Sequence, residues 1–99
     1  MTVNTVKDGT TLKVAIDGRV DTQTSPELEK VLKEAMEGIT DLELDFKDLI
    51  YISSAGLRVI LGAQNRMDAI NGNMVIKGAA KKIVDIFKVT GFDTFLNIE

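Results

Sequence analysis

The 99-residue sequence contains neither cysteine nor histidine. Without cysteine the chain can form no disulfide bond and offers no thiolate, so its fold does not depend on the redox state of its compartment. Without histidine or cysteine, nucleophilic catalysis would need a serine with a lysine or carboxylate base. No local spacing among the twelve basic and fifteen acidic residues suggests such a pair. These absences weigh against an enzyme.

Ligand-binding motifs are missing too. None of the eight glycines forms GxGxxG or GxxxxGK[ST], the loops that cradle phosphates in many nucleotide-binding proteins. Soft metal ligands are absent, and the acidic cluster of the chain lacks the pattern of an EF-hand (Asp41, Glu43, Asp45 and Asp48). We therefore expect no cofactor and no bound metal, and a small enzyme or nucleotide-binding protein is the least favoured class.

Long apolar runs are also lacking. The longest uncharged run, Leu49 to Leu57, has nine residues and includes two serines, whereas a membrane-spanning helix needs about 20 apolar residues. Met1 to Lys13 lacks the basic and then apolar layout of a signal peptide. The net charge of −3 disfavours binding to nucleic acid, which needs a basic face. We expect a cytoplasmic protein with no membrane insertion and no nucleic-acid partner.

The first half of the chain predicts a hairpin and a helix within a single domain, residues 1–99. Apolar and polar residues alternate from Thr11 to Asp17, and Asp8-Gly9 is a suitable turn to an antiparallel strand at Thr2 to Lys7. Gly18 should interrupt this strand, with residues 19–21 as a separate extended piece. An apolar stripe between Leu28 and Ile39 then predicts a helix. It should begin either with Ser25 as N-cap and Pro26 at N1, or with a capping box of Thr24 and Glu27.

The second half predicts a βαβ unit followed by a third helix. Strands are expected at residues 42–46 and 74–76, joined through a helix from about Ser54 to Ile70 whose apolar stripe includes Leu61 and Ile70. A helix over residues 80–89 should end at Thr90-Gly91, and residues 95–98 either add an edge strand or form none. The fold class is α/β, bordering on α+β. The sheet is small and mixed, antiparallel at the N-terminus and parallel later, with helices covering it.

Two adjacent serines, Ser53 and Ser54, stand where an apolar strand-like run turns into the central helix. The first N–H groups of a helix lack intrahelical partners and carry a partial positive charge, so a phosphate there would meet donors. On physical grounds alone, either serine is most simply a helix N-cap worth about 1 kcal/mol. Gly56 in the first turn is unfavourable by about 1 kcal/mol relative to alanine. Either tight packing on the sheet or a partner's surface should therefore need the space it leaves.

The run DLIYISSAGL at 48–57, continued by RVIL at 58–61, resembles the signature of the STAS domains, in particular the bacterial anti-sigma factor antagonists. Two further matches lie on either side of it. The segment IDGRVD at 16–21 is similar to the family's pattern of an apolar residue, a glycine, an apolar residue and an aspartate. The segment FKVTGF at 87–92 is similar to its late phenylalanine and glycine-aromatic element. The resemblance therefore spans nearly the whole chain.

This resemblance implies a fold and a regulatory function. In the family, the serine that matches Ser54 is phosphorylated by an anti-sigma factor that is also a serine kinase. The unphosphorylated antagonist binds that kinase and frees a sigma factor, and a metal-dependent serine phosphatase resets the system. The resemblance implies Asp21, Ser53, Gly56 and Leu57 as partner-binding residues. Many members carry aspartate at the position of Ser53.

A second hypothesis stays open from the sequence. The chain could be a STAS module of another kind, an accessory subunit that docks constitutively on a transporter or signalling complex and is never phosphorylated. In that case Ser54 is only a helix cap, and a negative charge at this position leaves affinity unchanged.

Overall fold

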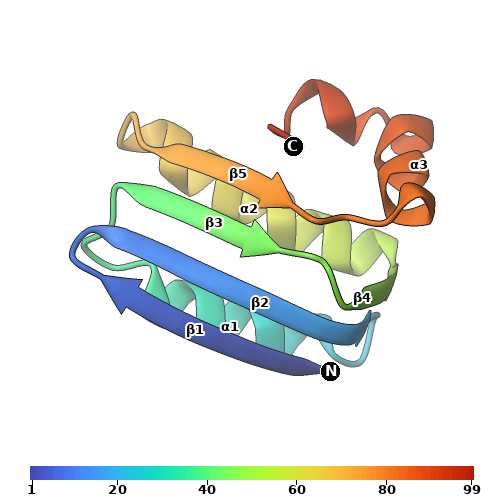
Figure 1. The fold of residues 1–99 in the computed structure, drawn as a ribbon, viewed down its shortest axis with the longest axis horizontal. Coiled ribbons are helices and arrows are strands. Elements are labelled where there is room, and N and C mark those ends of the chain that lie inside the picture. Colours follow the sequence, from blue (N-terminus) through green and yellow to red (C-terminus); the bar gives the residue numbers. More distant parts are fainter.

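The computed structural model describes all of residues 1–99 and contains a mixed five-stranded sheet (Figure 1). Two helices, α1 (Ser25–Ala35) and α2 (Ser54–Ala69), pack on one face of this sheet, and a third helix, α3 (Lys81–Thr90), lies beyond the carboxyl end of β5 (Asn73–Lys77). The elements are β1 (Thr2–Asp8), β2 (Thr11–Val20), α1 (Ser25–Ala35), β3 (Asp41–Asp45), β4 (Leu49–Ile52), α2 (Ser54–Ala69), β5 (Asn73–Lys77) and α3 (Lys81–Thr90), followed by a short 3-10 helix (Phe92–Thr94). The expected fold class is confirmed.

The sheet begins with an antiparallel hairpin and continues in parallel. β1 pairs with β2 antiparallel, β2 and β3 are parallel, and so are β3 and β5. The hairpin loop is Gly9-Thr10 and not the expected Asp8-Gly9, because Asp8 still pairs with Thr11. Gly9 takes a φ of +61°, a conformation that glycine adopts readily and that the first position of a two-residue hairpin loop favours.

β2 changes its parallel partner along its length. Its first half pairs with β3, and its last three residues pair with β4 in a register that shifts between Gly18 and Arg19. The expected break at Gly18 is therefore wrong: the strand continues to Val20, and Gly18 marks an irregularity with a φ of +98°. The Gly18 N–H donates to the carbonyl of Asp48 over 3.0 Å. This exchange brings the end of β2 beside β4.

The core lies between the sheet and the helices. The inward residues of β2 and β3 are almost fully buried, as the alternation predicts (Leu12, Val14, Ile16, Leu42 and Leu44). Two residues of the predicted α2 stripe differ from expectation: Ile70, just past the end of the helix, is 56% exposed, and Leu61 is only half-buried. Val59 and Gln64 are buried instead. The rest of the predicted stripe is buried (Gly56, Leu57, Ile60, Ala63 and Met67). The helix packs against both the sheet and α1, so its buried face extends beyond this stripe to Val59, which faces α1.

The ends of α1 and α3 show how their sequences set the helix limits. Thr24 is the N-cap of α1, but its hydroxyl donates to the carbonyl of Arg19 over 3.0 Å and makes no capping bond. Neither predicted capping arrangement forms, and Ser25 is already helical. Gly91 ends α3 with a φ of +77°, as expected.

The C-terminal part of the chain packs on the core without adding a full strand. The rings of Phe46 and Phe87 stack with centroids 6.3 Å apart and hold α3 against the sheet. Residues 95–98 form only an isolated parallel bridge between Ile76 and Ile98. None of the three α-helices combines the length and apolar character needed to cross a membrane.

Candidate functional site

The serine pair lies at the carboxyl ends of two neighbouring parallel strands. Val20 at the end of β2 pairs with Ile52 at the end of β4, and the Ser53 N–H donates to the Val20 carbonyl over 2.8 Å. Asp21 and Ser53 therefore continue the chain directly from paired strand ends. The loop into α1 and the start of α2 lie side by side at this end of the sheet (Figure 1).

The two serines have different roles in the structure. Ser53 has extended backbone angles, and its Oγ accepts a hydrogen bond from the Gly56 N–H over 3.3 Å, so Ser53 is the N-cap of α2. Ser54 is the first residue of the helix, its side chain is exposed, and its hydroxyl forms no hydrogen bond within the chain. No carboxylate or lysine side chain of the protein hydrogen-bonds to this accessible hydroxyl.

Gly56 allows the start of α2 to approach the sheet closely. A Cβ at this position would lie 2.7 Å from Cγ1 of Val20 and 2.8 Å from Cγ1 of Ile52. Packing is therefore the reason for the glycine. Leu57 is only 3% exposed. The expectation that Gly56 and Leu57 contact a partner directly is wrong, because both residues are buried. They pack beneath the exposed residues at the start of α2.

Asp21 organises the loop that leads into α1. Its Oδ1 accepts the backbone N–H groups of Thr24 and Gln23, each over 3.0 Å, and the Thr24 hydroxyl over 3.2 Å. These bonds, with the Thr24 N–H as the largest contribution, lower the pKa of Asp21 against the opposing effect of desolvation, and the charge of Arg19 also lowers it. Asp21 is half-buried. It places a negative charge in the loop that adjoins Ser53.

Two apolar side chains at this end of the sheet were not identified from the sequence. Ile50 is 52% and Tyr51 36% exposed on β4, between the buried residues Leu49 and Ile52. The Arg19 guanidinium lies 4.4 Å from the centroid of the Tyr51 ring, a cation–π arrangement. A four-residue strand is too short for its periodicity to reveal which side chains face outward. The pairing of β4 with the shifted end of β2 decides it.

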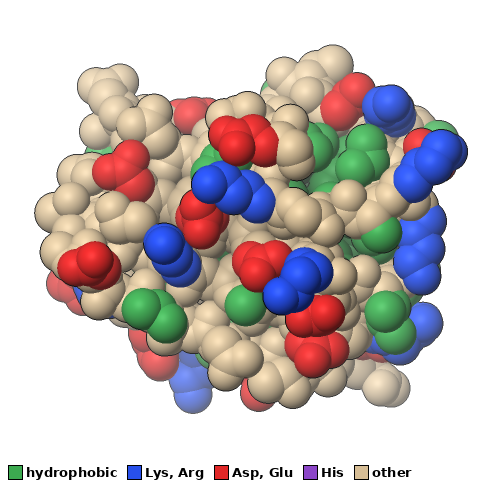
Figure 2. Space-filling model, in the orientation of Figure 1, with side chains coloured by type: hydrophobic (Ala, Val, Ile, Leu, Met, Phe, Trp, Pro, Cys, Tyr) green, Lys and Arg blue, Asp and Glu red, His purple; other side chains and the backbone are tan.

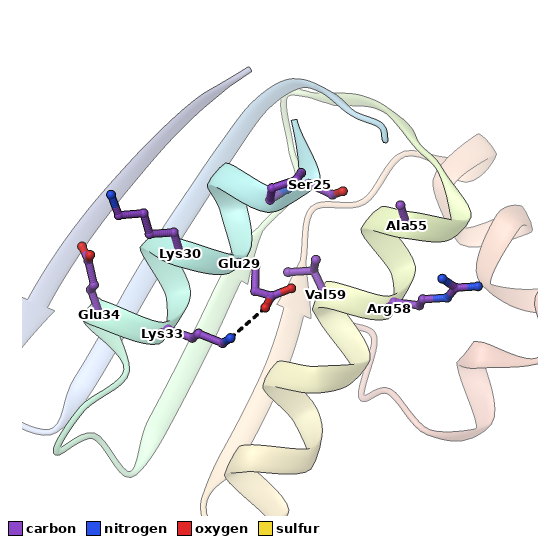
Figure 3. A pocket seen from close by; sticks show the side chains of 9 residues that line it. Ser25, Glu29, Lys30, Lys33, Glu34, Ala55, Arg58 and Val59 are labelled. Atoms are coloured by element: carbon purple, nitrogen blue, oxygen red, sulfur yellow. Dashed lines mark ion pairs between the residues drawn. The ribbon is translucent and has the colours of Figure 1, made fainter. Parts of the chain in front are cut away.

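A groove of about 670 Å³ runs between α1 and α2 next to the serines (Figure 3). Within α1, Lys33 and Glu29 form an ion pair over 2.8 Å. On α2, Val59 points toward α1, whereas Arg58 points away from it (Figure 3). The groove is lined mainly by charged residues of α1 and by the first turns of α2 (Ser25, Pro26, Glu29, Lys30, Lys33, Glu34, Ala55, Arg58 and Val59).

Other surfaces of the molecule do not show a comparable site. The face of the sheet that the helices leave uncovered carries interspersed acidic and basic side chains (Figure 2), including a Glu43–Lys77 ion pair over 2.8 Å. This ion pair raises the pKa of Lys77 through hydrogen bonding and charge attraction. No group of three or more acidic side chains is placed to hold a metal ion. The distinctive chemistry is thus at the start of α2.

Comparisons with known proteins agree with this architecture. Residues 3–97 match the family model described as "Mlab, STAS domain". An anti-sigma-B factor antagonist of Staphylococcus epidermidis is 26% identical over 99 residues, covering 99% of this chain and 92% of the relative.

Two solved structures have a similar fold. The unphosphorylated anti-sigma factor antagonist SpoIIAA has a TM-score of 0.78 at 14% identity, covering 99% of this chain and 87% of that one. The phosphorylated form of the Bacillus cell fate determinant SpoIIAA has a TM-score of 0.77 at 15% identity, covering 99% and 91%. Since the family model matches residues 3–97, nearly the whole of this sequence, the chain belongs to the STAS domain family.

Proposed function

We propose that this protein is an anti-sigma factor antagonist switched by phosphorylation of Ser54. In its unphosphorylated form it binds an anti-sigma factor that is also a serine kinase, and so frees a sigma factor. A metal-dependent serine phosphatase reverses the modification. The observation that carries the proposal is the exposed, unbonded Ser54 hydroxyl at the start of α2, beside a separate residue, Ser53, that caps the helix.

The comparisons support the regulatory part of this proposal. The curated relatives are named anti-sigma-B factor antagonists, and one of them is covered over 92% of its length. The SpoIIAA fold has been solved in both unphosphorylated and phosphorylated forms. A protein of this kind acts as a binding partner and a kinase substrate, in the cytoplasm, and catalyses no step itself.

The proposed modification needs only what Ser54 offers. The Ser54 Oγ attacks the γ-phosphorus of an ATP held by the kinase, the bond to ADP breaks, and the hydroxyl proton passes to a base of the kinase. The product carries about −1.5 to −2 charges at neutral pH. Since Ser53 keeps its capping bond to Gly56, the start of α2 tolerates the phosphate.

The effect of the phosphate then falls on the interface. Ile50 and Tyr51 are exposed apolar side chains on the strand that leads into the serines, and Asp21 adds a negative charge in the adjoining loop. A partner that covers these residues would desolvate the phosphate at a surface that already carries the negative charge of Asp21. A penalty of about 3 kcal/mol already weakens binding more than a hundredfold. No change of fold is required for switching.

Incubation with candidate switch kinases and ATP, followed by mass spectrometry of the peptide that contains both serines, tests the assignment. We expect one phosphate on the wild type and on Ser53→Ala, and none on Ser54→Ala. Ser54→Ala should still bind the kinase, whereas Ser54→Asp should bind it poorly. Label that persists in Ser54→Ala would refute the assignment. Equal binding by wild type and Ser54→Asp would favour a constitutive accessory subunit.

A further inference from the structure

Arg58 on α2 has no ionic partner in the structure. Its side chain is exposed and points away from α1 and therefore from the carboxylates of that helix (Figure 3). The ion pairs of the chain involve Lys33, Lys77 and Lys81, and the first turn of α2 carries no acidic residue. The guanidinium is thus free to meet a new negative charge.

Arg58 follows Ser54 by four residues on the same helix. Side chains at i and i+4 lie on one face, and helical side chains lean toward the N-terminus, so the Arg58 side chain can reach the turn that begins at Ser54. Such a pair is most favourable when the anion is on the N-terminal residue and the cation on the C-terminal residue. Arginine also presents parallel N–H donors that match phosphate oxygens.

Other groups near Ser54 are already engaged or carry the wrong charge to bind a phosphate. Arg19 of β2 already stacks over the Tyr51 ring. Asp21, in the loop before α1, is an anion and is bonded to Thr24 and Gln23. The Gly56 N–H is bonded to Ser53 Oγ and the Leu57 N–H to the Ser53 carbonyl. Arg58 is therefore the side chain that can neutralise a phosphate on Ser54 from within its own helix.

We propose that Arg58 binds the phosphate on Ser54, so that the modified protein is held by an ion pair within α2. This inference rests on the proposed phosphorylation of Ser54. Phosphorylation then has two effects on the surface. It adds a dianion, and it pairs that dianion with Arg58, which in the unmodified protein is free to bind a carboxylate of a partner. Arg58 acts here as a positioning residue for the phosphate.

The test places phosphoserine at position 54 during translation by codon suppression, so it needs no kinase. The second ionisation of the phosphate is followed by ³¹P NMR in the otherwise wild-type chain, in Arg58→Gln, in Arg58→Lys and in Arg66→Gln, a control two helical turns further on. We expect Arg58→Gln to raise the phosphate pKa by about 0.3 unit or more. Arg58→Lys should raise it less and Arg66→Gln by about 0.1 unit at most. The difference between wild type and Arg58→Gln should shrink in about 1 M salt.

Two results would overturn the inference: an Arg58→Gln protein that titrates like the wild type, or an Arg66→Gln protein that shifts as much as Arg58→Gln. A different result would contradict the proposed function: no kinase would phosphorylate Ser54. The NMR titration still gives its answer in that case.

Discussion

Gly56 of α2 packs directly on Val20 of β2. A Cβ on Gly56 would lie 2.7 Å from the Val20 Cγ1 atom and 3.3 Å from the Val20 carbonyl oxygen. The same carbonyl accepts the Ser53 N–H over 2.8 Å. The close approach of the end of β2 and the start of α2 therefore depends on two features: the absence of a side chain at Gly56, and the hydrogen bond from the Ser53 N–H to the Val20 carbonyl. Together they determine the position of Ser54.

Gly56→Ala should destabilise the protein. The added methyl group meets two core side chains and a backbone oxygen, and overpacking of this kind lowers the free energy of unfolding by about 1–3 kcal/mol. The gain in helix propensity, about 1 kcal/mol, offsets only part of this loss. Urea denaturation of the two proteins measures the difference.

Gly62→Ala is the matched control on the same helix. Nothing lies within 4 Å of a Cβ at Gly62, so this change should raise stability by up to about 1 kcal/mol. An equal gain in stability from both substitutions would show that Gly56 is not required for packing.

Ser53→Ala and Ser54→Ala should differ in stability. Ser53→Ala removes the capping acceptor of the Gly56 N–H and should lower the free energy of unfolding by about 0.5–1 kcal/mol, since the bond of 3.3 Å is long. Ser54→Ala removes an exposed hydroxyl without a partner, and the change should stay within about 0.5 kcal/mol. Ser53→Asp, which supplies another capping oxygen, should retain the stability of the wild type. Thermal and urea unfolding would contradict this division of roles if Ser54→Ala proved the more damaging change.

Much of the fold could be predicted from the sequence because its signals are local. The alternation in β2, the apolar face of α1 and the glycine that ends α3 each depend on residues within a few positions of one another. The helix from Ser54 was also predicted to within a residue of its observed end at Ala69. These local patterns agree with one another, and they suffice for the fold class.

The site could be predicted only in part, because its details depend on tertiary packing. Either serine could cap α2 from the sequence, and only the extended backbone at Ser53 decides between them. Ile50 and Tyr51 are exposed because β2 pairs with β4 after its pairing with β3 ends, and no local sequence pattern predicts this change of partner strand. Ile70 fits the apolar stripe of α2, but the helix ends before it and leaves it exposed.

The stability of the protein should depend on pH through Asp21. Its pKa in the folded state lies below the ordinary value of 3.8, mainly because its carboxylate accepts the Thr24 N–H. The unfolded chain therefore takes up a proton at higher pH than the folded chain. The stabilisation is fully present above about pH 5 and is lost as the pH falls through the folded pKa.

Asp21→Asn isolates this effect. Asparagine keeps an acceptor oxygen for Gln23 and Thr24 but carries no charge, so its deficit relative to wild type should be constant near neutrality and shrink in acid. Asp21→Ala, which loses the acceptor as well, should be less stable than Asp21→Asn at every pH. Chemical denaturation between pH 2.5 and 7 gives the two curves. A deficit of Asp21→Asn that grows in acid would contradict the assignment.

Ile50→Ser should weaken binding of the unphosphorylated protein to the proposed anti-sigma factor kinase. Ile50 is 52% exposed on β4, in the strand that leads into the serines, and truncation of a central apolar contact typically lowers affinity about fivefold or more. Val6→Ser on β1 is a matched control, since Val6 is a β-branched residue 62% exposed in another strand. Both changes should lower stability by similar small amounts of about 1 kcal/mol or less. Isothermal calorimetry should find the loss of affinity in Ile50→Ser alone. Equal affinities for the two variants would place the interface elsewhere, because the exposed apolar surface beside Ser54 would then contribute no more than that of β1.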